Sequence, residues 1–119
     1  MVGGANGEVY VTEAFAGAVS RIDKNGEKTV LAKELKMPEG IARGSDGKLI
    51  VAEVGAKRLI EIAPDSGKVT EIAANLPIGL VGAPGGLPSN IPTGVAIGAT
   101  GVIYVPSDIE NAVYKVVKK

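Results

Sequence analysis

The 119-residue sequence contains no cysteine and no histidine. Without cysteine, neither a disulfide framework nor a thiolate metal cluster can form. Without histidine, the chain lacks the imidazole that a Ser-His-Asp triad, a histidine general base or a histidine-ligated zinc ion requires. These two absences exclude several common classes of hydrolase and zinc site.

Aromatic residues are also scarce, at 3% of the chain, whereas apolar residues make up 45%. The core must therefore be aliphatic. Thirteen basic and thirteen acidic residues cancel, and the concentrated positive field that binds nucleic acid is missing. We expect no nucleic-acid partner.

Long hydrophobic runs are absent as well. No apolar segment approaches the roughly 18 residues of a membrane-spanning helix, and no basic stretch followed by an apolar core marks a signal peptide. We expect a soluble chain without a membrane partner. Its localisation stays open, because a secreted protein without its leader would look the same.

What the sequence does contain is an internal repeat. A Gly-x-apolar-apolar-Val phrase occurs three times, with an apolar segment after it at constant offset, and two copies follow a Pro-x-Gly-[Ile/Val]-Ala phrase. The glycine-led phrase opens segments 7–13, 47–53 and 101–107, and the apolar segment after it occupies 18–22, 58–62 and 112–116. The proline-led phrase occupies 38–42 and 92–96. The spacing is 40 residues from Gly7 to Gly47 and 54 residues from Gly47 to Gly101. Periods near 40 with several short strands are typical of propeller blades.

Each repeat unit is predicted to form four strands. Turn pairs at 6–7, 46–47 and 100–101 end in glycine, which supplies the positive φ of tight hairpins. The second strand of each unit is apolar on both faces, as a blade between two others requires. The fourth alternates, as in 68–72, which indicates an edge strand at the rim. The alternative, a β-sandwich with turns every 8–12 residues, rarely repeats such phrases at equal offsets.

We predict one all-β domain over residues 1–119, a β-propeller with about three four-stranded blades, the third lacking its outer strand. The blade units are about 1–35, 36–76 and 91–119, with an inserted loop at 77–90. Propellers close with about 4–8 blades, and three would leave two apolar faces exposed. We therefore predict a homodimer that completes a six-bladed ring around a twofold axis. An engineered or excised half-propeller is the alternative origin, and it would need to associate in the same way.

The repeated phrases resemble those of the NHL and SMP-30/gluconolactonase-like propellers over nearly the whole chain. The resemblance implies a mostly six-bladed fold that binds ligands at the mouth of its central channel. Loop 77–90 would lie there as a lid or pocket wall, or would form a dimer contact. The family includes lactonases, lyases, strictosidine-synthase-like enzymes and binding scaffolds. Its virginiamycin-lyase type relies on histidine, which this chain lacks.

Candidate ligand-binding residues lie at the expected channel mouth. Glu13 and Glu53 end the second strands of two units, and Asp108 follows that of the third. Convergent carboxylates would bind a divalent cation or divide acid and base roles; the alternative is local hydrogen bonding to the next loop. Arg58 would attract an anion or lie solvated, and Asn90 ends the inserted loop.

One metal ligand follows from the resemblance alone. In the family's lactonases a glutamate just before the glycine that opens an inner strand binds the catalytic metal, and Glu39-Gly40 lies in that position. Partner ligands have no secure match: Asn90, Asp108 and Asn111 stay unassigned, and Thr93 takes the position of Glu39 in the third unit. Ca²⁺ or another divalent cation would be the cofactor.

The leading functional hypothesis is a non-enzymatic propeller scaffold or binding module that pairs with itself. It would bind at most a small molecule, weakly, in the channel. No catalytic residue is assigned, and no cofactor is required. The alternative is a metal-dependent lactonase-like hydrolase with Glu39 as a ligand, and a chelator would then lower its melting temperature.

Overall fold

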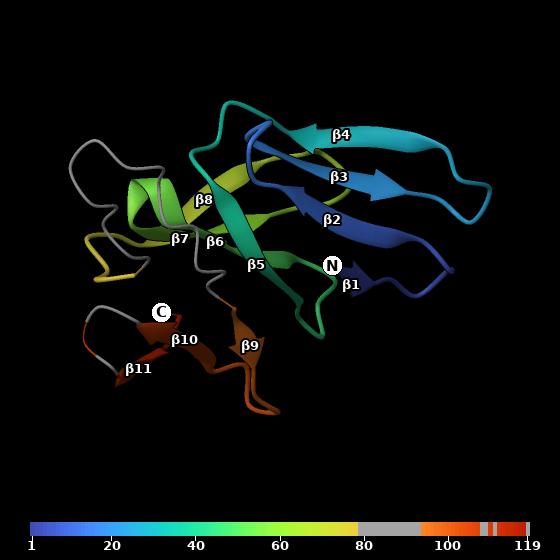
Figure 1. The fold of residues 1–119 in the computed structure, drawn as a ribbon. Helices are drawn as coiled ribbons and strands as arrows, with labels where there is room; N and C mark the ends of the chain where they lie inside the picture. The colour runs from blue at the N-terminus through green and yellow to red at the C-terminus, as the bar shows by residue number, and fades with distance from the viewer. Residues whose placement is uncertain (79–93, 108–109, 111, 119) are drawn as a thin grey trace.

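The computed structural model describes residues 1–78, 94–107, 110 and 112–118 of the chain (Figure 1). Within these residues the fold is all-β, with eleven strands and one short 3₁₀ helix, η1. The elements are β1 (Val2–Gly3), β2 (Val9–Glu13), β3 (Ala18–Ile22), β4 (Lys28–Ala32), β5 (Pro38–Arg43), β6 (Leu49–Glu53), η1 (Val54–Ala56), β7 (Arg58–Ile62), β8 (Val69–Ala73), β9 (Ala96–Ile97), β10 (Ile103–Ser107) and β11 (Ala112–Val116). No helix in the described part of the chain is long and apolar enough to cross a membrane.

The strands form three antiparallel sheets in which neighbours in sequence pair with each other. The first sheet has the order β1-β2-β3-β4, the second β5-β6-β7-β8, and the third β9-β10-β11 among the described residues. The expected all-β fold with antiparallel, blade-like sheets is confirmed. Inner strand β5 lies next to β1 and β2 of the first sheet and β9 of the third, so the inner strands of successive sheets gather together.

The turn between the first two strands of each sheet follows one design. Gly7, Gly47 and Gly101 have φ values of 85°, 84° and 84°, which side-chain-bearing residues rarely adopt. The N–H groups of Gly47 and Gly101 donate to carbonyls three residues earlier, each at 3.0 Å. The glycines expected from the turn pairs are therefore required by the backbone.

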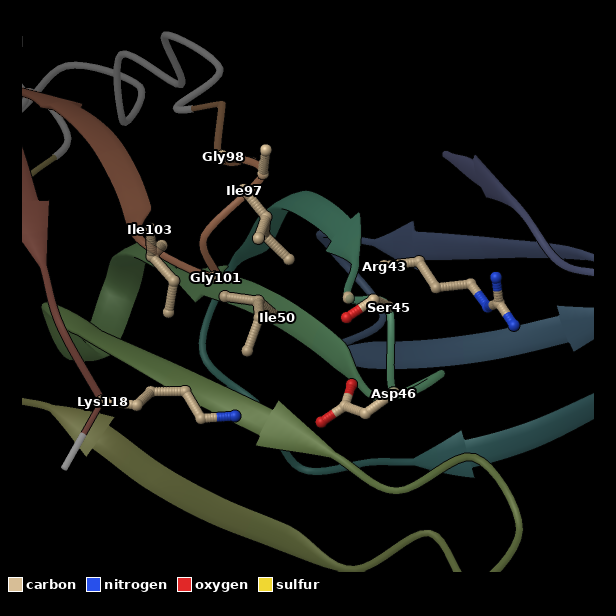
Figure 2. Close-up of a pocket in the computed structure, with 11 residues that line it drawn as sticks. Arg43, Ser45, Asp46, Ile50, Ile97, Gly98, Gly101, Ile103 and Lys118 are labelled. Atoms are coloured by element: carbon tan, nitrogen blue, oxygen red, sulfur yellow. The ribbon is translucent and has the colours of Figure 1, made fainter.

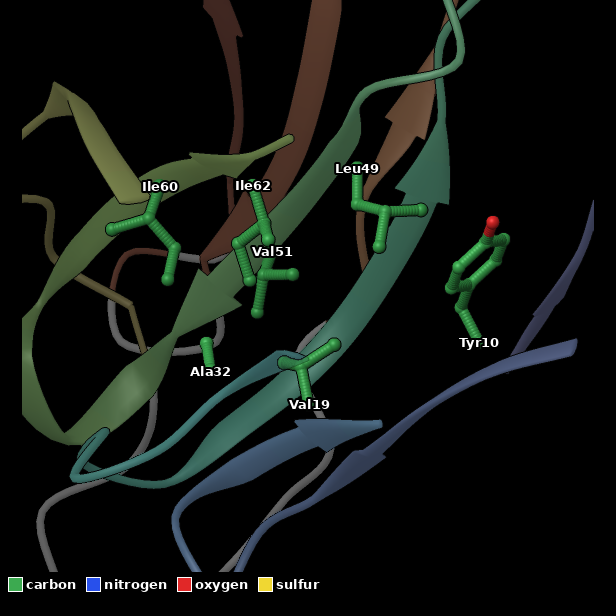
Figure 3. Packing of buried hydrophobic residues seen from close by; sticks show 7 residues of the cluster. All are labelled: Tyr10, Val19, Ala32, Leu49, Val51, Ile60 and Ile62. Atoms are coloured by element: carbon green, nitrogen blue, oxygen red, sulfur yellow. The ribbon is translucent and has the colours of Figure 1, made fainter. Parts of the chain in front are cut away.

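Two aliphatic layers hold the three sheets together. Leu49 and Val51 on one face of β6 belong to a cluster with Tyr10 and Val19 of the first sheet (Figure 3). Ile50, on the other face of β6, belongs to a second cluster with residues of β10. Every residue of β6 is buried, and each large aliphatic side chain removed from water contributes about 1.5–3 kcal/mol. The middle sheet is thus covered on both faces, as its sequence predicts.

The outer strands of the first two sheets are much more exposed. Three of the five residues of β4 are exposed, and so are three of the five of β8. In β10, Ile103 and Val105 are buried, whereas Tyr104 and Pro106 between them are exposed. One face of the third sheet therefore packs on the second, and its other face is open among the described residues.

Candidate functional site

The corner between β6 and β7 contains a buried carboxylate. Glu53 is 1% exposed; its Oε2 accepts a hydrogen bond from the Lys36 backbone N–H at 2.8 Å, and its Oε1 accepts one from Arg58 Nε at 2.6 Å. Lys36 lies in the segment between the first and second sheets, and its carbonyl accepts the Gly55 N–H at 2.9 Å. Glu53 therefore fixes the corner of the second sheet to the chain leaving the first.

Arg58 is held between two acidic side chains. Besides its contact with Glu53, its Nη1 donates to Glu71 Oε2 at 3.2 Å. The hydrogen bond to Glu53 raises the pKa of the guanidinium, and Glu71 adds to this effect. Charge-assisted contacts of this kind are short and directional. They favour the local hydrogen-bonding alternative for Glu53, and anion binding by Arg58 stays a prediction.

Glu13 ends β2 at the equivalent position in the first sheet, but it is more open. Its carboxylate pairs with Lys28 and accepts a hydrogen bond from Ser20 Oγ at 3.2 Å. Its side chain is 28% exposed, against 2% for Glu53. The hydrogen bond from Lys28, followed by that from Ser20, lowers the pKa of Glu13 despite partial desolvation.

The third sheet has a hydroxyl at the same position. Ser107, 2% exposed, donates to the Pro77 carbonyl and accepts the Glu110 N–H at 3.2 Å. The candidates Asp108 and Asn90 lie outside the described residues, as do Thr93, Asn111 and residues 79–90 of the inserted loop. Whether the three corners converge on one ligand stays a prediction.

Glu39 lies in β5, beside the first sheet. Its backbone carbonyl accepts the Thr12 hydroxyl at 2.6 Å, which links β2 to β5. In the described part of the chain, no group of three or more acidic residues is placed to hold a metal ion. The candidate partner ligands of Glu39 (Asn90, Asp108 and Asn111) lie outside the described residues, so the divalent cation that the resemblance to lactonases implies stays a prediction.

A pocket that the sequence did not indicate lies at the opposite end of the strands. It has a volume of about 250 Å³ and is bordered by the β5–β6 turn of the second sheet and the β9–β10 turn of the third (Figure 2). Ile50, Ile97 and Ile103 form its apolar side, and Asp46 and Lys118 lie on its rim. The sequence signal was the pair of repeated turns, but only their packing creates the hollow.

Two further hollows flank the corresponding turn of the first sheet. They measure about 420 and 310 Å³ and share Asn6, Glu8, Tyr10 and Asp65. Burial raises the pKa of Tyr10, whose hydroxyl donates to Glu8 at 3.2 Å. Among the described residues, each hollow is lined by several charged side chains and by no isoleucine, unlike the pocket between the second and third sheets.

The comparisons with known proteins concern the fold. No protein-family model and no curated protein matches the chain. Among solved structures, it is similar to a catalytically inactive histidine-to-alanine variant of virginiamycin B lyase from Staphylococcus aureus with quinupristin, at a TM-score of 0.71 and 22% identity over 95% of this chain and 35% of the other. A streptogramin B lyase structure matches at 0.67 and 13%, over 96% and 38%. A gluconolactonase-like protein matches at 0.59 and 13%, over 100% and 46%.

These similarities show that the three sheets have the arrangement of part of a propeller, and they confirm the resemblance at the level of fold. The chain spans 35% to 46% of the solved propellers named above. At 22% identity or less they show nothing of activity.

Proposed function

We propose that the chain is a propeller scaffold that completes its ring by self-association, with an open face of its third sheet docking on an open face of the first sheet of a second copy. The "N-terminal face" comprises Val9, Val11, Ile22 and Val30. The "C-terminal face" comprises Tyr104, Pro106 and Val113. Each face is therefore proposed to bind the other kind of face on a second copy of the chain.

The proposal rests on faces that are open in one sheet and buried at the equivalent place in the next. On the N-terminal face Val30 is 51% exposed, and Val9, Val11 and Ile22 are half-buried. Val9 and Val11 point away from the cluster that joins the first two sheets. Their equivalents in the second sheet, Leu49 and Val51, are fully buried against the first sheet. The N-terminal face thus has the position and chemistry of a surface that receives the preceding blade.

The C-terminal face corresponds, by the repeat, to the face of the second sheet that packs on the third sheet. Tyr104 and Val113 are 39% and 67% exposed, and Pro106 and Val113 are paired across β10 and β11. The equivalents of Tyr104 and Val113, Ile50 and Leu59, belong to the cluster that joins the second and third sheets. Exposed apolar residues of this kind support the proposal of an association site.

Two copies are the number that fits a closed ring. Twice three sheets gives six, within the range of about four to eight blades that propellers use. Two copies of a chain that spans 35% to 46% of the compared propellers would together span about 70% to 92% of their length. The two head-to-tail contacts of such a ring are identical, because rotation by half a turn exchanges the copies.

The solution mass tests this proposal directly. We expect a mass twice the 12.0 kDa of one chain by light scattering behind a sizing column. Val113→Glu and Val30→Glu, one on each face, should each reduce the mass to that of a monomer. Val69→Glu is the matched control, since Val69 is 38% exposed but lies on β8 of the middle sheet, outside both faces. A wild-type monomer at high protein concentration would contradict the proposal.

Mixing the two face variants distinguishes head-to-tail from face-to-face contact. Each variant lacks one face, so neither pairs with itself. The intact N-terminal face of Val113→Glu can still receive the intact C-terminal face of Val30→Glu, so the mixture should form a dimer with a single contact. If either variant still forms dimers when it is not mixed with the other, then like faces pair with each other, which would contradict the head-to-tail ring.

The lactonase-like hydrolase remains the alternative from the sequence. It requires a divalent cation, which would stabilise the folded chain by linkage. The scaffold proposal predicts that neither a chelator nor added Ca²⁺ changes the melting temperature. A drop on chelation that Ca²⁺ reverses would favour the hydrolase.

A further inference from the structure

The pocket between the β5–β6 and β9–β10 turns combines an apolar side with a charged rim. Ile50, Ile97 and Ile103 supply the apolar side and come from β6, β9 and β10 (Figure 2). With a volume of about 250 Å³, the pocket falls just below the roughly 300–1,000 Å³ of sites for drug-sized ligands. Its occupant is therefore small and carries a compact apolar group.

The acidic side of the rim is Asp46. Its Oδ1 accepts the Lys48 N–H at 3.0 Å and holds the turn. Among the described residues, neither its Oδ2 nor the hydroxyl of neighbouring Ser45 makes a hydrogen bond. In Figure 2 the Asp46 carboxylate and the Lys118 ammonium extend toward each other below the isoleucines. A ligand ammonium group can bind at Asp46 without displacing the turn contact.

The basic side of the rim has positive charge in excess. Glu61 pairs with both Lys118 and Lys48, the latter at 3.6 Å. One carboxylate therefore faces two ammonium groups, and of these two only Lys118 lines the pocket, together with Arg43 as a second cationic side chain. Lys118 is 38% exposed, so its ammonium can reach a second carboxylate at the pocket rim.

We infer that this pocket binds a free α-amino acid with an apolar side chain. The ligand ammonium binds Asp46, the ligand carboxylate binds Lys118, and the side chain packs on Ile50, Ile97 and Ile103. Charge-assisted contacts at both ends fix the orientation, and the apolar contact selects branched or aromatic side chains over glycine. The pocket lies within one copy, so its function is independent of self-association.

The hollow at the equivalent turn of the first sheet is the internal contrast. There Tyr10 takes the position of Ile50, and Pro64 takes that of Lys118. That hollow includes Asp46 and the cationic side chains of Arg43 and Lys48, but within the described part of the chain it lacks the aliphatic wall that would hold the apolar group of the ligand. Binding is expected between the second and third sheets alone.

Isoleucine-methyl NMR with L-leucine as the probe tests the inference. The methyl signals of Ile50, Ile97 and Ile103 should shift on titration, while those of Ile60 and Ile62 in the other cluster stay in place. Leucinamide and N-acetylleucine each lack one of the two charges, and glycine lacks the apolar group. Each should bind about tenfold more weakly or not at all. Leucinamide binding as tightly as leucine, or no shift at tens of millimolar leucine, would overturn the inference.

Substitutions assign the two charged contacts. Asp46→Asn keeps an acceptor for the Lys48 N–H but loses the charge, and Lys118→Met keeps an unbranched side chain of similar length without the charge. Each should weaken leucine binding about tenfold with the chain still folded. Lys24→Met is the matched control, because Lys24 lies two residues after β3 just as Lys118 lies two residues after β11. This variant should bind leucine like wild type. Unchanged binding in both rim variants would also overturn the inference.

Discussion

Glu13 and Glu53 occupy the same position at the ends of β2 and β6, yet their surroundings differ. Glu53 accepts a backbone N–H from the segment that leaves the first sheet and is buried with Arg58. Glu13 has no preceding sheet among the described residues, and it pairs with exposed Lys28 at the surface. The same residue is thus an interior clamp or a surface ion pair, depending on whether a sheet precedes it.

Removing the two carboxylates should give the largest contrast. Glu53→Ala leaves the Lys36 N–H and the Arg58 guanidinium without their main partner. The expected loss is about 3 kcal/mol, at the low end for a broken buried pair because Arg58 is partly exposed. Glu13→Ala should cost far less, since exposed ion pairs contribute little. Urea unfolding of both variants measures the difference, and Glu53→Gln serves if the alanine variant does not fold. Equal losses of stability in the two alanine variants would show that the burial of Glu53 does not make it more important than Glu13.

The left-handed residue in each corner should give a smaller contrast. Gly17 has a φ of 66°, and a Cβ there would lie 2.3 Å from the Leu35 carbonyl oxygen. Gly17→Ala should therefore lose about 1–3 kcal/mol. Lys57, with a φ of 55°, takes the equivalent position. Lys57→Gly should lose about 1 kcal/mol or less, because relief of backbone strain partly offsets the entropy of the unfolded glycine and the loss of the hydrogen bond from Lys57 Nζ to the Ile78 carbonyl. Thermal unfolding compares the stability of the two variants. If Gly17→Ala lost no stability, the backbone of the corner would have to relax around the added Cβ.

The smallest expected contribution to stability is that of the ion pair between Glu13 and Lys28, and acid should abolish it. The pKa of Glu13 is lowered in the folded chain by Lys28, so its contribution is present above the unfolded pKa. That contribution is lost as the pH falls through the folded value. The difference in urea midpoint between wild type and Glu13→Gln should shrink from pH 7 to pH 3. Glu27→Gln, an exposed change in the next turn, is the control. A difference that is constant with pH would assign the effect to packing rather than charge.

Several features of the fold could be predicted because they depend on local patterns. The glycines at 7, 47 and 101 follow from the positive φ of tight turns, and the two apolar faces of β6 follow from its uninterrupted run of aliphatic residues. The edge position predicted for residues 68–72 agrees with the exposure of Val69, Thr70 and Glu71 in β8. Each is a property of a few consecutive residues, and such properties are readable without the fold.

The functional residues were harder to predict, because they depend on neighbours far apart in sequence. The identical position of Glu13 and Glu53 suggested one shared role, but Lys36 reaches only Glu53. The pairing of Glu61 with Lys118 joins residues separated by 57 positions. The isoleucine-lined pocket arises where two separate turns pack together, and no single segment encodes it.

The sequence alone determined the repeating unit, its turns and its aliphatic strands, because backbone geometry and hydrophobic alternation act over a few residues. The tertiary structure decided which faces are covered, which carboxylate is buried and where a pocket lies. These depend on the stacking of one sheet on the next, since burial and charge pairing are set by atoms that the chain brings together only when it folds.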